Sequence, residues 1–175
     1  IRDSLLSNIT FCEGLKRECD ENKTIGDKHQ LHFTPVMQDN DIVRLATSEP
    51  GQYMSFAEML NETPAVVAQR DFLKTVLEGL VSITTLLHKK GIRPPCFSPR
   101  TVFARKGDYS PMLLSHDSYY MSMSNLEEFY GDDAQYVAPE VLHHGTIDDR
   151  CDVYSLGKFL QGLCATSDMP FEYRS

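Results

Sequence analysis

The sequence predicts a mixed α+β fold in which helices alternate with small antiparallel hairpins. Apolar residues recur at helical spacing over residues 69–89. Two pairs of short apolar runs are each separated by turn-forming residues, as in β-hairpins. The chain has 175 residues, 41% of them hydrophobic, which is enough to bury a sizeable core.

Four segments are predicted to be helical. Residues 69–89 give the strongest signal, because one face carries a continuous apolar stripe, and Gly91 follows as the predicted C-cap. Residues 4–20 are predicted to form one helix, residues 55–60 a short helix, and residues 152–164 a helix with one apolar face. The residues of the strongest stripe are Phe72, Leu73, Val76, Leu77, Leu80, Ile83 and Leu87.

The predicted hairpins pair residues 32–37 with 42–47, and residues 102–104 with 112–114. Asp39-Asn-Asp41 and Gly107-Asp108 supply the turns, because these residue types tolerate left-handed backbone. Residues 115–135 show no clear period and are predicted to form a long loop. Pro94-Pro95 cannot continue a helix and predicts a stiff, extended segment.

Charge and hydropathy limit the kinds of partner. A net charge of -8 argues against nucleic-acid or anionic-membrane binding, because both need a basic surface. No apolar run approaches the roughly 20 residues of a membrane span. The sequence begins at Ile1 rather than Met, so we expect a fragment or a processed chain.

Two sequence patterns bear on the compartment and point in different directions. The five cysteines are an odd number without metal-type spacing, which favours reduced thiols and a cytoplasmic location. A secretory location stays open, because three segments match the glycosylation acceptor pattern. They are Asn8-Ile-Thr10, Asn22-Lys-Thr24 and Asn61-Glu-Thr63.

The run Tyr136-Val-Ala-Pro-Glu-Val-Leu142 is followed by Asp152-Val-Tyr-Ser-Leu-Gly157. Ala-Pro-Glu is a protein-kinase signature, and the pair resembles the end of a kinase activation segment and the helix after it. The resemblance implies a bilobal kinase-like fold that is incomplete at both ends. Residues 1–47 would form a partial N-lobe of one helix and one hairpin. Residues 48–175 would form a partial, mainly helical C-lobe, with structural motif residues Ala138, Pro139, Glu140, Asp152 and Gly157.

The resemblance places the catalytic loop at residues 94–101. Kinases hold the base and one metal ligand in a His-Arg-Asp-Leu-x-x-x-Asn loop. Here Pro94-Pro95 stands at the His-Arg pair, Cys96 at the catalytic Asp and Thr101 at the metal-binding Asn. A thiol has a reference pKa of about 8.5 and lacks the two acceptor oxygens of a carboxylate. We therefore expect no catalytic residue in this loop, and a packed, structural Cys96.

The second metal ligand would belong at the end of the second hairpin, where the chain reads Ser115-His116-Asp117. Ser115 then stands at the metal-binding Asp position. Hydroxyl and imidazole groups are weak Mg²⁺ ligands beside a carboxylate, so Mg²⁺ binding is not expected. Asp117, after a shift of one or two residues, or Asp108 would have to supply the lost carboxylate.

On the nucleotide side, no glycine-rich loop and no Val-Ala-Ile-Lys-type strand precede the first predicted helix. Glu18, or alternatively Glu13, would be the helix residue that pairs with the strand lysine, although surface pairing within the helix is the favoured interpretation. The hinge falls by position at Ala46, Thr47 and Ser48, whose backbone could bind a purine. ATP binding therefore stays open.

The resemblance also implies structural roles for two acidic residues. In the family, Asp152 accepts hydrogen bonds from the catalytic-loop backbone, and Glu140 pairs with an arginine of a later helix. We expect Glu140 to be exposed or to bind a substitute such as Arg150. Pro95 replaces an arginine that docks an activation-loop phosphate, so ordinary packing roles are expected for Tyr119, Tyr120, Tyr130 and Tyr136.

Taken as a whole, the substitutions predict a kinase-like fold without phosphotransfer: a pseudokinase that acts as a signalling scaffold or allosteric regulator. Its partner would be a protein, such as an active kinase or a signalling complex. One alternative is a divergent, secretory-pathway type of kinase that uses a non-standard carboxylate. Another is a sensor domain that binds ATP without Mg²⁺.

Overall fold

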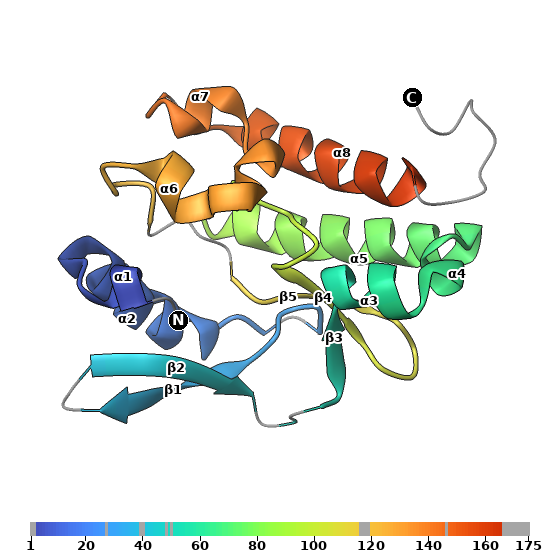
Figure 1. The fold of residues 1–175 in the computed structure, drawn as a ribbon, viewed down its shortest axis with the longest axis horizontal. Coiled ribbons are helices and arrows are strands. Elements are labelled where there is room, and N and C mark those ends of the chain that lie inside the picture. The colour runs from blue at the N-terminus through green and yellow to red at the C-terminus, as the bar shows by residue number, and fades with distance from the viewer. Residues whose placement is uncertain are drawn as a thin grey trace.

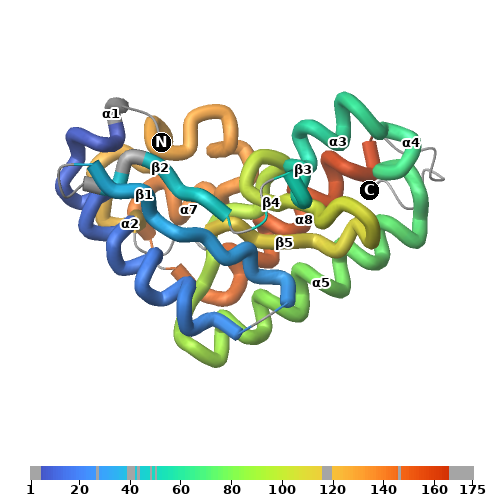
Figure 2. The backbone as a smooth tube through the Cα atoms, turned by 90° about the horizontal axis from the view of Figure 1, so that it is seen from below, coloured from blue at the N-terminus to red at the C-terminus, as the bar shows by residue number. Residues whose placement is uncertain are grey.

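The computed structural model describes residues 3–26, 28–38, 41–47, 49, 51–115, 120–145 and 147–165. Two long helices form its centre: α5 (Arg70–Lys89) and α8 (Asp149–Ala165) lie side by side (Figure 1). Helix α2 (Ile9–Asn22) and the hairpin of β1 (Phe33–Gln38) and β2 (Asp41–Thr47) lie at one end of the molecule. Figure 2 shows α3 (Phe56–Glu62) and α4 (Pro64–Val67) at the other end.

The single helix predicted over residues 4–20 is wrong, because the helix is interrupted between Leu6 and Ile9. A short helix, α1 (Asp3–Leu6), precedes the break, and α2 begins at Ile9. The Asn8 side chain causes the new start: its Oδ1 accepts a hydrogen bond from the Phe11 amide at 3.1 Å. Asparagine is a preferred N-cap, because its side chain satisfies a backbone donor at the helix start.

The first hairpin is confirmed, and one buried side chain ties it to α2. β1 and β2 pair antiparallel, with an irregularity between Val36 and Met37. Asn22, the last residue of α2, donates from Nδ2 to the Leu31 carbonyl at 3.1 Å. Its Oδ1 accepts from the Phe33 amide at 3.2 Å. The amide group of Asn22 therefore fixes where the chain leaves the helix and enters β1.

The second hairpin is also confirmed, and it carries a third strand that the sequence did not reveal. β4 (Val102–Arg105) pairs with β5 (Pro111–Leu113) on one side. β3 (Tyr53–Ser55) pairs with β4 on the other. Ser55 then caps α3, because its Oγ accepts from the Glu58 amide while the Glu58 carboxylate accepts from the Ser55 amide. Pro64 opens α4 at a position where a missing N–H costs nothing.

Helix α5 is confirmed almost to the residue. One glycine ends it, and another allows the sheet to approach it closely. Gly91 has a φ of +76°, and the Ile92 amide bonds back to the Leu87 carbonyl at 2.9 Å. This is the left-handed turn that ends helices at glycine. Gly79 faces β5 so closely that a Cβ would collide with the Pro111 ring. The sheet of β3, β4 and β5 therefore lies directly against α5.

The long loop predicted over residues 115–135 is wrong in part. The structure has α6 (Leu126–Tyr130) there, capped by the Asn125 side chain, and the 3-10 helix η2 (Gly131–Tyr136) after it. Short apolar-polar alternations of this length carry no helical period, so only packing against the rest of the chain selects them. Helix α7 (Pro139–Leu142) then leads to α8. Among the described helices, none has the length and apolar character needed to cross a membrane.

The buried apolar side chains form two clusters. The first core joins α3, α4, α5, β4, β5 and α8, and includes Phe56, Leu80, Ile83 and Phe159. The second core joins α2, β1, β2 and residues 120–141, and includes Phe11, Leu15, Tyr120 and Leu126. Cys96 of the predicted catalytic loop lies in the second core, whereas its neighbour Phe97 lies in the first. That loop therefore runs along the boundary between the two.

Replacing Asn22 with alanine is expected to lower the free energy of unfolding by about 2–4 kcal/mol, because a buried carbonyl and a buried amide lose their partners. Urea denaturation measures this. The control is Asn61→Ala, an exposed asparagine of α3, which should change stability by less than about 0.5 kcal/mol. Equal effects of the two substitutions would contradict the assigned role.

Candidate functional site

The segment that takes the place of the catalytic loop connects α5 to β4 and is anchored to α8 by a serine. The Phe97 amide donates to Ser155 Oγ at 2.6 Å, and both residues are fully buried. Ser155 is a buried residue of α8 and belongs to the run Asp152-Val-Tyr-Ser-Leu-Gly157 of the sequence analysis. One side-chain oxygen thus holds the middle of the loop in place.

Cys96 and Thr101 are both engaged within the protein. The Cys96 thiol is 1% exposed and lies 4.0 Å from the Asp133 carbonyl oxygen. Thr101 Oγ1 accepts from the Ser98 amide at 3.0 Å and lies 3.3 Å from the Ser98 hydroxyl. The residue at the base position is therefore packed, and the one at the metal-ligand position closes the loop's own turn.

A pocket of about 470 Å³ lies beside this loop. The exposed ion pair between Arg100 and Asp132, 2.8 Å from Nη2 to Oδ2, stands at its edge. The nearby Asp132 and Asp133 carboxylates raise the pKa of the Arg100 guanidinium. The residues that line the pocket are Arg100, Thr101, Phe129, Tyr130, Gly131, Asp132 and Asp133.

The surface pairing expected for Glu18 is wrong. Glu18 is only 2% exposed, whereas Glu13 is exposed. The Ser115 hydroxyl donates to Glu18 Oε1 at 2.5 Å, and the Tyr120 hydroxyl donates to Glu18 Oε2 at 2.5 Å. The structure therefore brings together two predicted site residues, Glu18 and Ser115, and adds Tyr120. Nothing in the local sequence around Tyr120 signals a partner 102 residues away.

Two further groups of predicted residues are those of the hinge and the candidate rescue carboxylates. Ala46 and Thr47 form the end of β2, where Ala46 is exposed. Ser48, at the hinge position, and Asp117, the rescue carboxylate, lie outside the described residues. Asp108 lies in the turn between β4 and β5, where bonds from Ser110 lower its pKa. Strand β4, about 13 Å long, runs between Thr101 and the turn that carries Asp108.

Asp152 does not hold the catalytic-loop backbone, so that expectation is wrong. Its Oδ2 is in contact with His88 Nε2, and its buried Oδ1 has no hydrogen-bond partner among the described residues. The reason lies in the loop, because Pro94 and Pro95 have no N–H to donate. Burial raises the pKa of the Asp152 carboxyl, and the hydrogen bond from His88 opposes that rise.

A small charged cluster joins the loop to both central helices. Arg93 Nε donates to Asp149 Oδ1 at 2.6 Å, and His88 Nδ1 lies 3.9 Å from the same oxygen. Together with the contact between His88 and Asp152, this links the last turn of α5, the loop and the first turn of α8. Such links between helix ends place opposite charges where the helix dipoles favour them.

The Ala-Pro-Glu residues form the start of α7. Ala138 is the buried N-cap, and Pro139 is the first helical residue. Glu140 is exposed, as one of the two expectations for it required. Arg150 is not its partner: it forms a bidentate pair with Asp148, with an Nη2 to Oδ2 distance of 2.6 Å. Gly157 lies on the exposed face of α8.

Within the described ranges, no three His, Cys, Asp or Glu side chains converge in a way that could hold a metal ion. The acidic groups near the loop are instead engaged with protein partners: Glu18 with two hydroxyls, Asp149 with Arg93 and Asp132 with Arg100. The arrangement is suited to holding segments together.

Replacing Ser155 with alanine should destabilise the chain by about 1–3 kcal/mol, because the buried Phe97 amide loses its acceptor. Urea denaturation at neutral pH checks this. Ser82→Ala, an exposed site on α5, serves as the control and should stay within about 0.5 kcal/mol of the parent chain. An unchanged midpoint for Ser155→Ala would show that the loop is anchored elsewhere.

Asp152→Asn should flatten the pH dependence of stability. Because the folded pKa of Asp152 is raised, its contribution is fully present below the unfolded pKa of about 3.9 and is lost as pH rises through the folded pKa. Asparagine does not titrate, so the variant should lose less stability than the parent over this rise. Urea denaturation from about pH 3 to 7 measures both curves, and parallel curves would contradict the prediction.

No protein-family model matches the sequence, and a search of the curated proteins finds no significant match. Solved structures do match. The chain is similar to the apo form of PpkA-294, with a TM-score of 0.62 and 17% identity over 92% of this chain and 57% of that one. It is also similar to a mutant kinase domain of Mycobacterium tuberculosis PknI, with a TM-score of 0.70 and 16% identity over 95% of this chain and 62% of that one.

The chain thus spans less than two thirds of the length of either neighbour. At this level of identity the likeness establishes architecture, and chemistry has to be argued from the site itself. The predicted α+β, bilobal arrangement is confirmed: the chain has a protein-kinase-like fold.

Proposed function

We propose that this chain is a pseudokinase-type domain, which acts by binding another protein as a scaffold or allosteric regulator and does not transfer phosphate. The observation that carries the proposal is the hydrogen bonding of the Glu18 carboxylate. Both oxygens of this carboxylate accept hydroxyl donors from the chain itself. In the kinase resemblance, this is the group that would pair with the ATP-anchoring lysine.

The substituted catalytic loop supports the same proposal. Phosphoryl transfer depends on carboxylate and amide oxygens that hold Mg²⁺ against the phosphates, and on a carboxylate that accepts the substrate proton. Cys96 is buried against the Asp133 carbonyl, and Thr101 is bonded to Ser98. Neither side chain presents a carboxylate or amide oxygen to a nucleotide.

The buried amide of Asn22 supports a cytoplasmic location for this binding role. A glycan on Asn22 Nδ2 would occupy the donor that bonds to Leu31 and would need space where the residue is 2% exposed. The acceptor pattern at Asn22 is therefore incompatible with glycosylation of the folded chain. Cytoplasmic folding avoids this conflict.

A thermal-shift titration with ATP, with and without Mg²⁺, tests the proposal. A ligand that binds only the folded state raises the melting temperature in proportion to RT ln(1 + [L]/Kd). We expect no Mg²⁺-dependent rise up to millimolar ATP, because the residues at the metal-ligand positions are a serine and a threonine.

Each other outcome identifies a different function. A rise that needs Mg²⁺ and disappears in Asp117→Asn would favour a divergent kinase that uses this carboxylate. A rise with ATP alone, unchanged by Mg²⁺ and by Asp117→Asn, would favour a nucleotide sensor. The matched control is Asp108→Asn, because Asp108 is bonded within the turn between β4 and β5 and should leave every outcome unchanged.

A further inference from the structure

We propose that the Glu18 carboxylate is a latch that joins α2 to Ser115 and to the segment from Tyr120 to Tyr130: its contacts open and close in one cooperative step, while α5 and its sheet stay folded. The inference goes beyond the proposed function, because it concerns how the domain changes state. It depends on no nucleotide and no partner.

The latch has two points of attachment on a single charged group. Ser115 Oγ and Tyr120 Oη each lie 2.5 Å from a different oxygen of Glu18. Glu18 and Tyr120 are 2% and 3% exposed, so the bond between them is shielded from water, whereas the bond from Ser115 is half-buried. Hydrogen bonds from a hydroxyl to a carboxylate are short and strong when they are shielded from water.

Sharing one carboxylate makes the two attachments depend on each other. If the segment carrying Tyr120 moved away alone, the buried Glu18 carboxylate would lose a strong hydroxyl donor, which is costly. If α2 moved alone, both hydroxyls would lose this carboxylate as an acceptor. Opening both contacts together exposes the carboxylate to water, which satisfies it. The closed and open states are therefore separated by a cooperative step.

Aromatic contacts also join α2 to the segment from Tyr120 to Tyr130, along a contact line that we call the seam. The Tyr120 ring stacks on Phe11 of α2, with centroids 5.2 Å apart and an interplanar angle of 24°. It also lies 5.2 Å from the Phe129 ring of α6. The hydroxyl of Tyr120 thus holds Glu18, while its ring joins α2 to α6. Loss of the hydroxyl alone would leave this ring stack in place.

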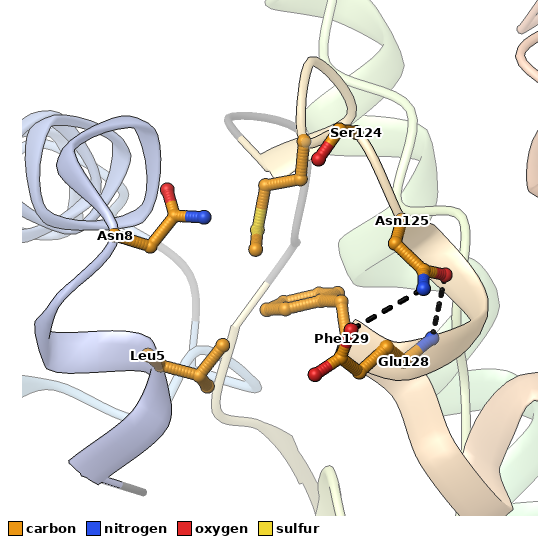
Figure 3. Close-up of a pocket in the computed structure, with 7 residues that line it drawn as sticks. Leu5, Asn8, Ser124, Asn125, Glu128 and Phe129 are labelled. Atoms are coloured by element: carbon orange, nitrogen blue, oxygen red, sulfur yellow. Dashed lines mark hydrogen bonds between the residues drawn. The ribbon is translucent and has the colours of Figure 1, made fainter.

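The outer part of the seam is incompletely filled. A pocket of about 100 Å³ lies there. In Figure 3, Leu5 of α1 and Asn8, the N-cap of α2, face Phe129 and Asn125 at the start of α6. The side chains at its rim are mostly polar: Asn8, Ser124, Asn125 and Glu128. At this outer end, polar side chains therefore take the place of the apolar packing found around Tyr120.

The division of the core allows these contacts to open by themselves. No described residue of α5 belongs to the second core, and none of α2 belongs to the first. Opening the latch disturbs the second core around Phe11 and Tyr120 and leaves the first core of α5, β4 and β5 packed. Local opening in such contiguous units is a general property of folded domains.

Hydrogen exchange of the whole chain, with Tyr120→Phe as the main variant, tests the latch. This change keeps the ring and removes only the hydroxyl. We expect amides in α2 and in residues 120–130 to exchange about tenfold faster or more, with no change in α5. The matched control is Tyr53→Phe, which removes a tyrosine hydroxyl bonded to an exposed glutamate, Glu49, at 3.3 Å and should leave all three segments unchanged.

Three results would overturn the proposal: faster exchange in residues 120–130 without α2, faster exchange in α5 as well, or no change anywhere. A second comparison uses Ser115→Ala alone and combined with Tyr120→Phe. Because both hydroxyls share Glu18, the double variant should accelerate exchange by less than the product of the single effects. Strictly multiplicative effects would mean that the two contacts are independent, which also rejects a shared latch.

Discussion

The bond from the Phe97 amide to Ser155 is the interaction on which the rest of this structure depends. It fixes the loop that runs between the two cores, and it does so from the inner face of α8. The neighbouring carboxylate of Asp152 cannot take this role, because the two prolines before Cys96 have no N–H to offer it. The Ser155 hydroxyl therefore anchors the middle of the loop to α8, while Asp152 binds His88 at the end of α5.

Glu18 and Asp152 are both buried carboxylates, and both are bound by side chains of this chain. In the kinase resemblance, both serve the nucleotide site or its loop. In this chain Glu18 binds Ser115 and Tyr120, and Asp152 binds His88. A buried carboxylate must have partners. These pairs connect segments that are far apart in the sequence, and they stabilise the fold.

The chain shares a kinase-like architecture with solved structures at only 16–17% identity. Helices α5 and α8 and the two hairpins need only apolar periodicity and turns, which tolerate wide sequence change. A reaction needs particular side chains at particular points, and at the positions that the kinase resemblance assigns to catalysis this chain carries Cys96, Thr101 and Ser115. The proposed binding role rests on this difference between what a fold requires and what a reaction requires.

The sequence alone determined the long amphipathic helices, the turn at Gly91 and the two hairpins, because each depends on local pattern. Only the tertiary structure decided the break at Asn8, the third strand β3, the burial of Glu18 and the part played by Tyr120. Glu18 lies 97 residues from Ser115 and 102 from Tyr120. No local period encodes such a contact. In the sequence, Glu18 is one of several charged residues of a predicted helix, and only the folded chain brings a distant segment over it.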